Sequence, residues 1–174
     1  MYIPAHLNPL VHGALNPLVN GTINPMVNGS INPLVNGSRN PLINGSINPM
    51  VNGSINPLVN GSVNYLVNGS INPLVNGSIN PMVNGSINPT INAAYSGPFF
   101  FDTQGRATGF GVVANSGVVV LFSDSLGHAG TAIPAGDMLA IFDTSNRWTG
   151  YLVPTGSGGY ARFDTSGQWV GYSH

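Results

Sequence analysis

One octapeptide, written eleven times in succession, constrains the fold of this chain more than any other feature. The unit reads Asn-Pro-Leu-Val-Asn-Gly-Ser-Ile, with small edits, and successive units start eight residues apart. The starting residues are Asn8, Asn16, Asn24, Asn32, Asn40, Asn48, Asn56, Asn64, Asn72, Asn80 and Asn88. A fixed period of this kind indicates an array in which every unit repeats one local structure.

The residues of the unit exclude a long helix and favour short strands joined by corners. Pro in a helix interior costs about 3 kcal/mol and Gly about 1 kcal/mol, and nearly every unit contains both. Pro also holds the preceding Asn extended, while Asn and Gly tolerate the positive φ of a corner. We therefore expect a β-helix or β-solenoid. Disorder, typical of Pro, Gly, Ser and Asn, is disfavoured because an aliphatic residue fills the Val position of every unit.

Alternation along a strand returns each repeat position to the same face in the next unit, because eight is an even number. The Val position accepts only Ile as a substitute, so we predict that it forms the core. This core ladder comprises Val11, Val19, Val27, Val35, Val51, Val59, Val67, Val75 and Val83. The unvaried Asn of Asn-Pro predicts a second ladder, in which amides bond to their copies in adjacent layers. This Asn ladder comprises Asn16, Asn24, Asn32, Asn40, Asn48, Asn56, Asn72 and Asn80.

Two other features of the unit concern its exposed positions. The Pro position accepts Tyr65 and the Ile position accepts Arg39, which predicts that both positions touch solvent or an edge. Leu and Val are adjacent, so a regular strand cannot bury both on one side. Either a corner turns one of them inward, or a Leu/Met stripe faces outward as a contact surface for another chain.

Read from Val, each unit is Val-x-Gly followed by five residues, as in VNGTINPM from Val19 and VNGSINPL from Val27. This pattern resembles the octapeptide repeat of the triple-stranded β-helix in phage and type VI secretion spikes. The resemblance covers about half the chain and implies three identical chains wound around one axis, with Val inward and Gly at the bend. Pro in the units departs from that family's pattern. A weaker similarity, to the half-coils of a grass antifreeze β-roll, implies a single-chain solenoid.

From Tyr95 onward the octapeptide is no longer present, and four segments share a second sequence pattern. They begin at Phe101, Phe122, Phe142 and Phe163, at intervals of 20 or 21 residues. An apolar run ends at Phe, a polar turn follows, and the chain resumes with Gly and commonly an aromatic, which is typical of a β-hairpin. We expect four hairpins forming a small meander, prism or barrel-like domain over residues 95–174. The lead-in covers residues 1–7 and the repeat array residues 8–94.

The hairpin segments also resemble the repeats of choline-binding modules, although most of the paired Trp residues of that family's choline cages are missing. An aromatic platform for a glycan stays open, with Trp148 and Trp169 as its residues. The alternative is that both belong to the hairpin core or to subunit contacts. Asp102, Asp143 and Asp164 stand at the first turn position, where Asp caps its own backbone. Turn structure explains these carboxylates better than catalysis does.

Composition narrows the classes of partner. Charged residues make up 5% of the chain, with neither Lys nor Glu and a net charge of −1, against about 25% in an average domain. Such a chain lacks the positive field that attracts nucleic acid. Pro, Asn and Gly interrupt every apolar run, so no membrane span is expected. Without Cys, neither disulfides nor thiolate metal sites are expected, no cofactor is predicted, and no secretory signal is recognisable.

These patterns together predict an all-β protein with an octapeptide-repeat shaft, an intertwined homotrimer or a single-chain solenoid, followed by the hairpin-repeat domain. The favoured function is a non-enzymatic structural fibre, extracellular or on a virion, that assembles with itself into a shaft or a head-to-tail filament. One alternative is a tail-fibre or adhesin tip that binds a cell-surface glycan through the hairpins. Another, less favoured, is an ice-binding solenoid. No catalytic constellation or metal site is predicted.

Overall fold

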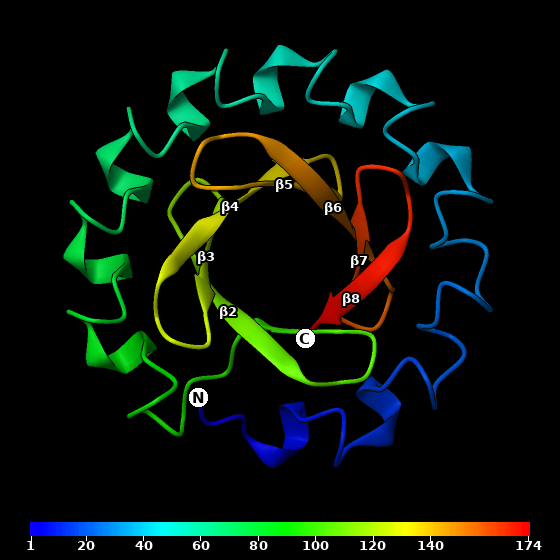
Figure 1. Ribbon diagram of the computed structural model, residues 1–174, viewed down its shortest axis with the longest axis horizontal. Helices are drawn as coiled ribbons and strands as arrows, with labels where there is room; N and C mark the ends of the chain where they lie inside the picture. Colours follow the sequence, from blue (N-terminus) through cyan, green and yellow to red (C-terminus); the bar gives the residue numbers. More distant parts are fainter.

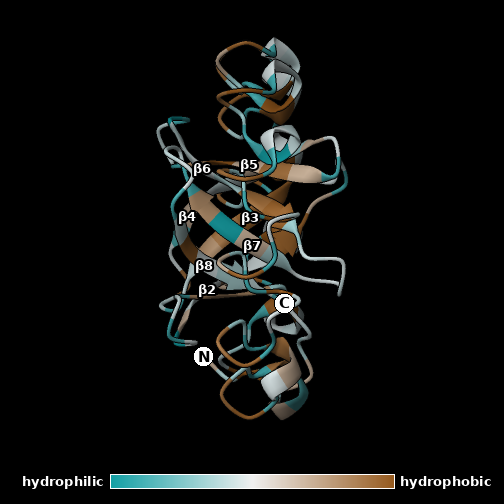
Figure 2. Cartoon of the chain, turned by 90° about the vertical axis from the view of Figure 1, so that its right-hand side faces the viewer, coloured by the Kyte–Doolittle hydropathy of each residue, from teal (hydrophilic) through white to brown (hydrophobic).

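The repeat array and the hairpin segments form one body rather than a shaft with an appended domain. A computed structural model describes all residues, 1–174. Residues 99–173 close an eight-stranded antiparallel barrel, and the octapeptides form a ring around it (Figure 1). Seen from the side, the ring is a narrow band, and the turns of the barrel extend beyond it in both directions (Figure 2). The expected β-helix or solenoid shaft is therefore wrong.

The barrel is a meander in which each strand pairs with the next and β8 pairs back with β1. Its hairpins, β1–β2, β3–β4, β5–β6 and β7–β8, coincide with the four segments that recur in the sequence. The strands are β1 (Phe99–Phe101), β2 (Ala107–Val113), β3 (Val119–Ser123), β4 (His128–Ala135), β5 (Met138–Phe142), β6 (Trp148–Pro154), β7 (Tyr160–Asp164) and β8 (Trp169–Ser173). A closed barrel has no free strand edge, so it offers no place for a filament to grow by strand addition.

Each hairpin carries one β-bulge opposite a glycine, and that glycine lies close to the backbone of the neighbouring hairpin. The pairing register shifts after Phe100, Leu121, Ile141 and Arg162. The glycines that face these bulges are Gly109, Gly130, Gly150 and Gly171. A Cβ on Gly150 would lie 2.2 Å from the carbonyl oxygen of Phe163. No side chain fits at that separation, which explains why Gly returns in every hairpin.

Each octapeptide forms two consecutive turns instead of a strand and a corner. In the unit that starts at Asn40, the N–H groups of Ile43 and Asn44 both donate to the Asn40 carbonyl, at 3.0 and 2.7 Å. Asn44 then caps the 3-10 helix Gly45–Ile47 by accepting the N–H of Ser46. No glycine of the repeat has a positive φ, so the expected glycine corner is absent.

The 3-10 helices tolerate residues that break a long helix because each is a single turn with only two backbone hydrogen bonds. Pro lies outside them, at the second position of the preceding turn, where its fixed φ is favourable. The helices are η1 (Ala5–Leu7), η2 (Gly13–Leu15), η3 (Gly37–Arg39), η4 (Gly45–Ile47), η5 (Gly53–Ile55), η6 (Gly61–Val63), η7 (Gly69–Ile71), η8 (Gly77–Ile79) and η9 (Gly85–Ile87).

The N-terminal lead-in closes the ring. The Tyr2 N–H donates to the carbonyl of Pro89, in the last octapeptide, at 2.8 Å. Within the lead-in, η1 repeats the 3-10 turn of the octapeptides. The seven residues before Asn8 therefore form part of the ring, and the array has no open end.

Ring and barrel share a fixed register. Leu10 packs on the β1–β2 turn and Leu34 on the β7–β8 turn, where a Cβ placed on Gly105 or Gly167 would lie 3.0 Å from a leucine methyl. The two leucines are 24 residues apart and contact neighbouring hairpins, so the ring advances by three octapeptides for each hairpin of the barrel. Four hairpins then require twelve positions around the ring, which eleven octapeptides and the lead-in supply.

The main core lies between the ring and the barrel. It joins the repeat's Ile side chains, such as Ile55 and Ile71, to aromatic side chains on the outside of the barrel, such as Phe110 and Tyr172. A smaller cluster fills the barrel lumen, with Phe100, Val119, Leu121, Ala132, Ile141 and Leu152. Each of the two repeat arrays therefore supplies one face of a shared core.

Candidate functional site: the aliphatic rim

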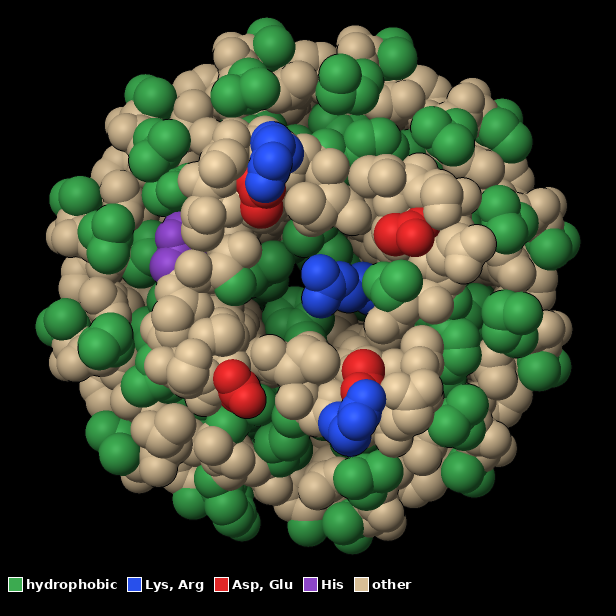
Figure 3. Space-filling model, in the orientation of Figure 1, with side chains coloured by type: hydrophobic (Ala, Val, Ile, Leu, Met, Phe, Trp, Pro, Cys, Tyr) green, Lys and Arg blue, Asp and Glu red, His purple; other side chains and the backbone are tan.

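Adjacent aliphatic side chains of successive octapeptides project from the outer circumference of the ring, and we call this set the aliphatic rim. Its members are Leu10, Val11, Leu18, Val19, Met26, Val27, Leu34, Val35, Leu42, Ile43, Met50, Val51, Leu58, Val59, Leu66, Val67, Leu74, Val75, Met82, Val83 and Ile91. The exposed fraction of these residues is 60–79%. Figure 3 shows them as pairs of hydrophobic side chains around the perimeter. Many exposed apolar side chains repeated along one edge are typical of a contact site.

Hydrogen bonds within each unit hold the pair outward. Asn40 Oδ1 accepts the N–H of Leu42 at 2.9 Å, and the Asn40 carbonyl accepts the next two N–H groups. The tight turn leaves the third and fourth side chains outside, while Pro and Ile face the barrel. Val51 also packs against the preceding unit, because a Cβ on Gly45 would lie 3.3 Å from its Cγ1.

The rim overturns the predicted core ladder. Every member of that ladder is at least 69% exposed, namely Val11, Val19, Val27, Val35, Val51, Val59, Val67, Val75 and Val83. Ile is the buried residue of the unit instead, with Ile71 at 0% exposed. The prediction failed because period-two alternation applies to strands, and the unit forms turns. The alternative of an outward stripe describes the ring better, since both aliphatic residues face outward.

The Asn residues of Asn-Pro stabilise turns and join neighbouring units, but they do not stack amide on amide. Their Oδ1 atoms accept an N–H two residues on in the units of Asn16, Asn24, Asn40, Asn48 and Asn72. The Nδ2 donates to a Pro carbonyl of the preceding unit, at 2.9–3.0 Å, from Asn32, Asn56 and Asn80. The expected amide-to-amide ladder is replaced by amide-to-backbone bonds because consecutive units meet turn to turn.

The second Asn of the unit is a regular link that the sequence interpretation missed. Asn44 Nδ2 donates to the Ser38 carbonyl of the preceding unit at 3.0 Å, and its Oδ1 accepts the Ser46 hydroxyl at 2.7 Å. The same pair of bonds recurs at Asn52, Asn60, Asn68, Asn76 and Asn84. The near-constant Asn-Gly-Ser sequence of the repeat could have indicated these hydrogen bonds.

The two edited positions are contacts between ring and barrel and not solvent positions. Arg39, in place of Ile, forms a salt bridge of 2.5 Å with Asp137 in the β4–β5 turn. The hydrogen bond from Arg39 lowers the pKa of Asp137. Tyr65, in place of Pro, is buried and donates its hydroxyl to the Thr144 carbonyl at 2.6 Å. Its ring lies edge-on to His128, with centroids 4.7 Å apart.

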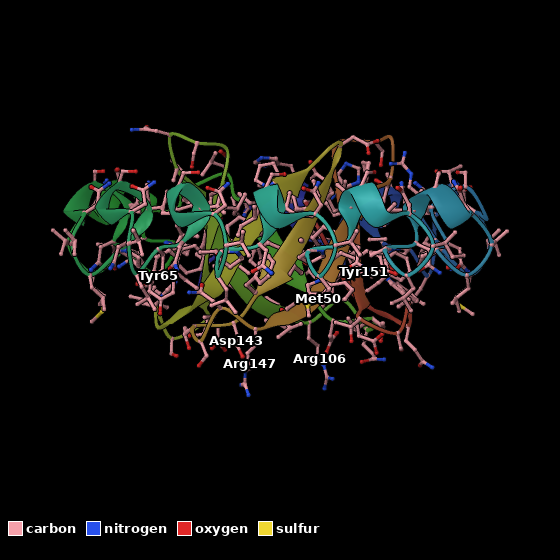
Figure 4. All side chains as sticks on the ribbon, turned by 90° about the horizontal axis from the view of Figure 1, so that it is seen from above. Met50, Tyr65, Arg106, Asp143, Arg147 and Tyr151 are labelled. Atoms are coloured by element: carbon pink, nitrogen blue, oxygen red, sulfur yellow. The ribbon has the colours of Figure 1, made fainter.

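Trp148 and Trp169 lie at equivalent places on the seam between barrel and ring. Each indole N–H donates to the carbonyl of the glycine two residues on, at 2.8 and 2.7 Å. Trp169 borders a cavity of about 270 Å³ with Met26, and Trp148 borders one of about 290 Å³ with Met50. Both indoles pack against the main core. Figure 4 labels Met50 on the ring and Arg147 on the barrel turn beside it.

The barrel's Asp residues hold hairpin turns, as predicted. Asp143 Oδ1 accepts the N–H groups of Ser145 and Arg147 at 2.8 and 3.0 Å, and its Oδ2 accepts Arg147 Nε at 2.8 Å. The hydrogen bond from the Arg147 backbone is the main reason that the pKa of Asp143 is lowered. Asp102 and Asp164 accept corresponding backbone N–H groups. The hydrogen bonds of these three carboxylates stabilise the hairpin turns.

Comparison with known proteins gives no relative from which a function could be transferred. No family model, no curated protein and no solved structure matches the chain. Within the structure, no group of three His, Cys, Asp or Glu side chains could hold a metal ion. None of its helices has the length and apolar character needed to cross a membrane. The function has to be inferred from the geometry of the molecule itself.

Proposed function

We propose that this protein is a non-enzymatic structural component that associates with further copies of itself through the aliphatic rim. The rim is the observation that supports this proposal. It repeats around the ring at intervals of eight residues and carries no charge, since the single Arg of the ring, Arg39, is bound to the barrel. We call one molecule, the barrel with its surrounding ring, a disc. Covering apolar surface is favourable by about 25 cal/mol per Å², so burial of rim side chains between two discs favours their association.

The circular shape of the rim favours edge-to-edge contact between discs. Each unit presents a similar pair of side chains, so a second disc meets an equivalent surface wherever it approaches. Two convex edges touch over only a few units, and full burial of a Val or Leu contributes about 1.5–3 kcal/mol. Association costs about 4–15 kcal/mol, so a single contact is weak and several contacts must act together. We expect clusters or planar arrays of discs.

Multi-angle light scattering over a range of protein concentrations tests this proposal. The mass should rise above the 18.0 kDa of one chain as the concentration increases. A triple variant, Val35→Lys, Val59→Lys and Val83→Lys, places charges on the rim and should remain monomeric because like charges repel. A matched control adds the same charges beside the rim, at the exposed residues Ser38, Ser62 and Ser86.

The wild type and the serine control should associate alike, and the valine variant should not. A wild-type protein that stays monomeric at its highest soluble concentration would remove self-association from consideration. Negative-stain images of the same samples distinguish planar arrays from clusters. An extracellular or virion-associated location is also part of this proposal, and fractionation of the producing cells tests it.

Binding of a cell-surface glycan is a second candidate, supported by the matching seam cavities beside Trp148 and Trp169. An indole face offers an apolar surface to a sugar ring, with polar groups nearby. A glycan array should show binding that is reduced in Trp148→Ala and Trp169→Ala. Equal binding by both variants would leave the indoles as core residues only.

A further inference from the structure

The barrel lumen opens at the end that carries the Asp-containing turns, and an arginine lines the opening. The cavity there has a volume of about 320 Å³. Its wall includes Phe100, Leu121, Ile141 and Arg162, with the hydroxyl side chains of Thr108, Ser123 and Thr149. Figure 3 looks onto this end and shows a central hollow that contains a basic side chain.

Arg162 breaks the fourfold repeat of the barrel. One residue precedes the Phe of each hairpin segment, and in order these residues are Phe100, Leu121, Ile141 and Arg162. The first three belong to the apolar cluster that fills the lumen. A fourth apolar residue would complete that layer without desolvating a charge, which is costly unless the charge is paired. Packing of the barrel therefore does not explain the arginine.

Arg162 also has no partner within the chain. The three salt bridges use Arg39, Arg106 and Arg147. Burial alone lowers the pKa of Arg162, with no contribution from an acidic group. Asp143 is the one carboxylate on the cavity wall, and it is already bound to Arg147. The guanidinium thus presents its N–H donors to the cavity without an internal acceptor.

We propose that this opening binds a small organic carboxylate, with the carboxylate on Arg162 and an apolar body among Phe100, Leu121 and Ile141. A guanidinium matches a carboxylate through two parallel hydrogen bonds. Removal of water from a partly enclosed site strengthens such bonds. Half of the lining residues are hydrophobic, which favours a ligand with an apolar body over an inorganic anion. A single aromatic ring bearing a carboxylate represents this class.

An NMR titration of ¹⁵N-labelled protein with benzoate tests the site directly. Benzamide provides nearly the same shape without the charge, and inorganic phosphate provides charge without the apolar body. Benzoate should produce saturable shifts at the cavity residues and at the Arg162 Nε–H. Arg162→Met should weaken binding at least about ten-fold, the loss expected for a hydrogen bond to a charged group. Arg106→Met, which removes a paired arginine at the same end, should leave the affinity unchanged.

Three results would overturn the proposal. They are the absence of saturable benzoate shifts, equal affinity in Arg162→Met, and phosphate binding as tight as that of benzoate. The Met variant should fold, because replacing a half-buried, unpaired charge by an apolar side chain relieves desolvation. A thermal melt verifies this, and Arg162→Gln gives the same test if Met disturbs the barrel. The outcome does not depend on whether the discs associate.

Discussion

The ring and the barrel are both built from short repeats, but the two repeats make different contacts. Each barrel hairpin bonds to its neighbours through the backbone, strand to strand. Each octapeptide closes most backbone bonds within its own turns and reaches the next unit mainly through Asn amides. The local structure of a ring unit is therefore set by its own eight residues, whereas its stability depends on burying Ile against the barrel.

The inner face of the ring packs against the barrel, whereas the outer face is exposed, and the two faces differ in which residues vary. The inner face varies where the barrel requires it, at Arg39 and Tyr65. The outer face keeps an aliphatic pair in nearly every unit, although these side chains are at least 60% exposed. A residue kept for packing inside the chain and a residue kept for contact outside it can thus look equally regular in the sequence.

Replacing one buried and one exposed aliphatic residue gives the largest expected effect. Ile71→Ala should lower the free energy of unfolding by about 2–5 kcal/mol because it leaves a cavity in the shared core, where Ile71 is 0% exposed. Val75→Ala, at a position 72% exposed, should change it by no more than about 0.5 kcal/mol. Chemical denaturation of both variants in dilute solution measures the difference. Similar losses in the two variants would contradict the assignment of inner and outer faces.

Alanine at a barrel glycine and at a ring glycine separates the two kinds of repeat further. Gly150→Ala should cost about 2–3 kcal/mol, because the new Cβ would lie 2.2 Å from the Phe163 carbonyl oxygen. At Gly69 the nearest atom is Val75 Cγ1 at 3.5 Å, and φ is not positive. Gly69→Ala should therefore be neutral or stabilise by about 0.4–1 kcal/mol through the unfolded chain. Thermal melts of the pair provide the test, and a large loss in the ring variant would show that its turn requires glycine.

The barrel hairpins could be predicted from the sequence because their signal is local. Phe, the polar turn and Gly recur in each of the four segments, and hairpin pairing follows from neighbouring residues. The closure of four hairpins into a barrel was one of three architectures left open. Asp143 was correctly assigned to a turn for the same local reason.

The ring could not be predicted, because the burial of its residues depends on a barrel surface formed by a different part of the sequence. Val and Ile are both aliphatic and both recur every eight residues, so neither composition nor period distinguishes core from rim. The period-two assumption then placed Val inside. Arg39 and Tyr65 looked like tolerated surface edits, whereas their partners are Asp137 and Thr144, far along the chain.

Tyr65 offers a smaller and more specific test of how the barrel shapes the ring. Tyr65→Phe removes the hydroxyl that donates to the Thr144 carbonyl and should cost about 0.5–1.5 kcal/mol. Tyr2→Phe is a control, since Tyr2 is 54% exposed and should change stability little. Denaturation curves of both variants measure the effect. Equal stability of wild type and Tyr65→Phe would indicate that Tyr65 acts through packing alone.

Arg39→Ile restores the consensus residue and has the smallest expected effect. The side chain of Asp137 is 63% exposed, so solvent screens the bridge and its loss should cost less than about 1 kcal/mol. Arg39 lowers the pKa of Asp137 in the folded protein. The stabilisation is therefore present above the unfolded pKa of about 3.9 and disappears as the pH falls through the folded value. Denaturation of wild type and variant should differ at neutral pH and converge in acid or at high salt. A difference that persists in acid would mean that the stem of Arg39 contributes by packing, and that this ring position follows the same rule as its Ile neighbours.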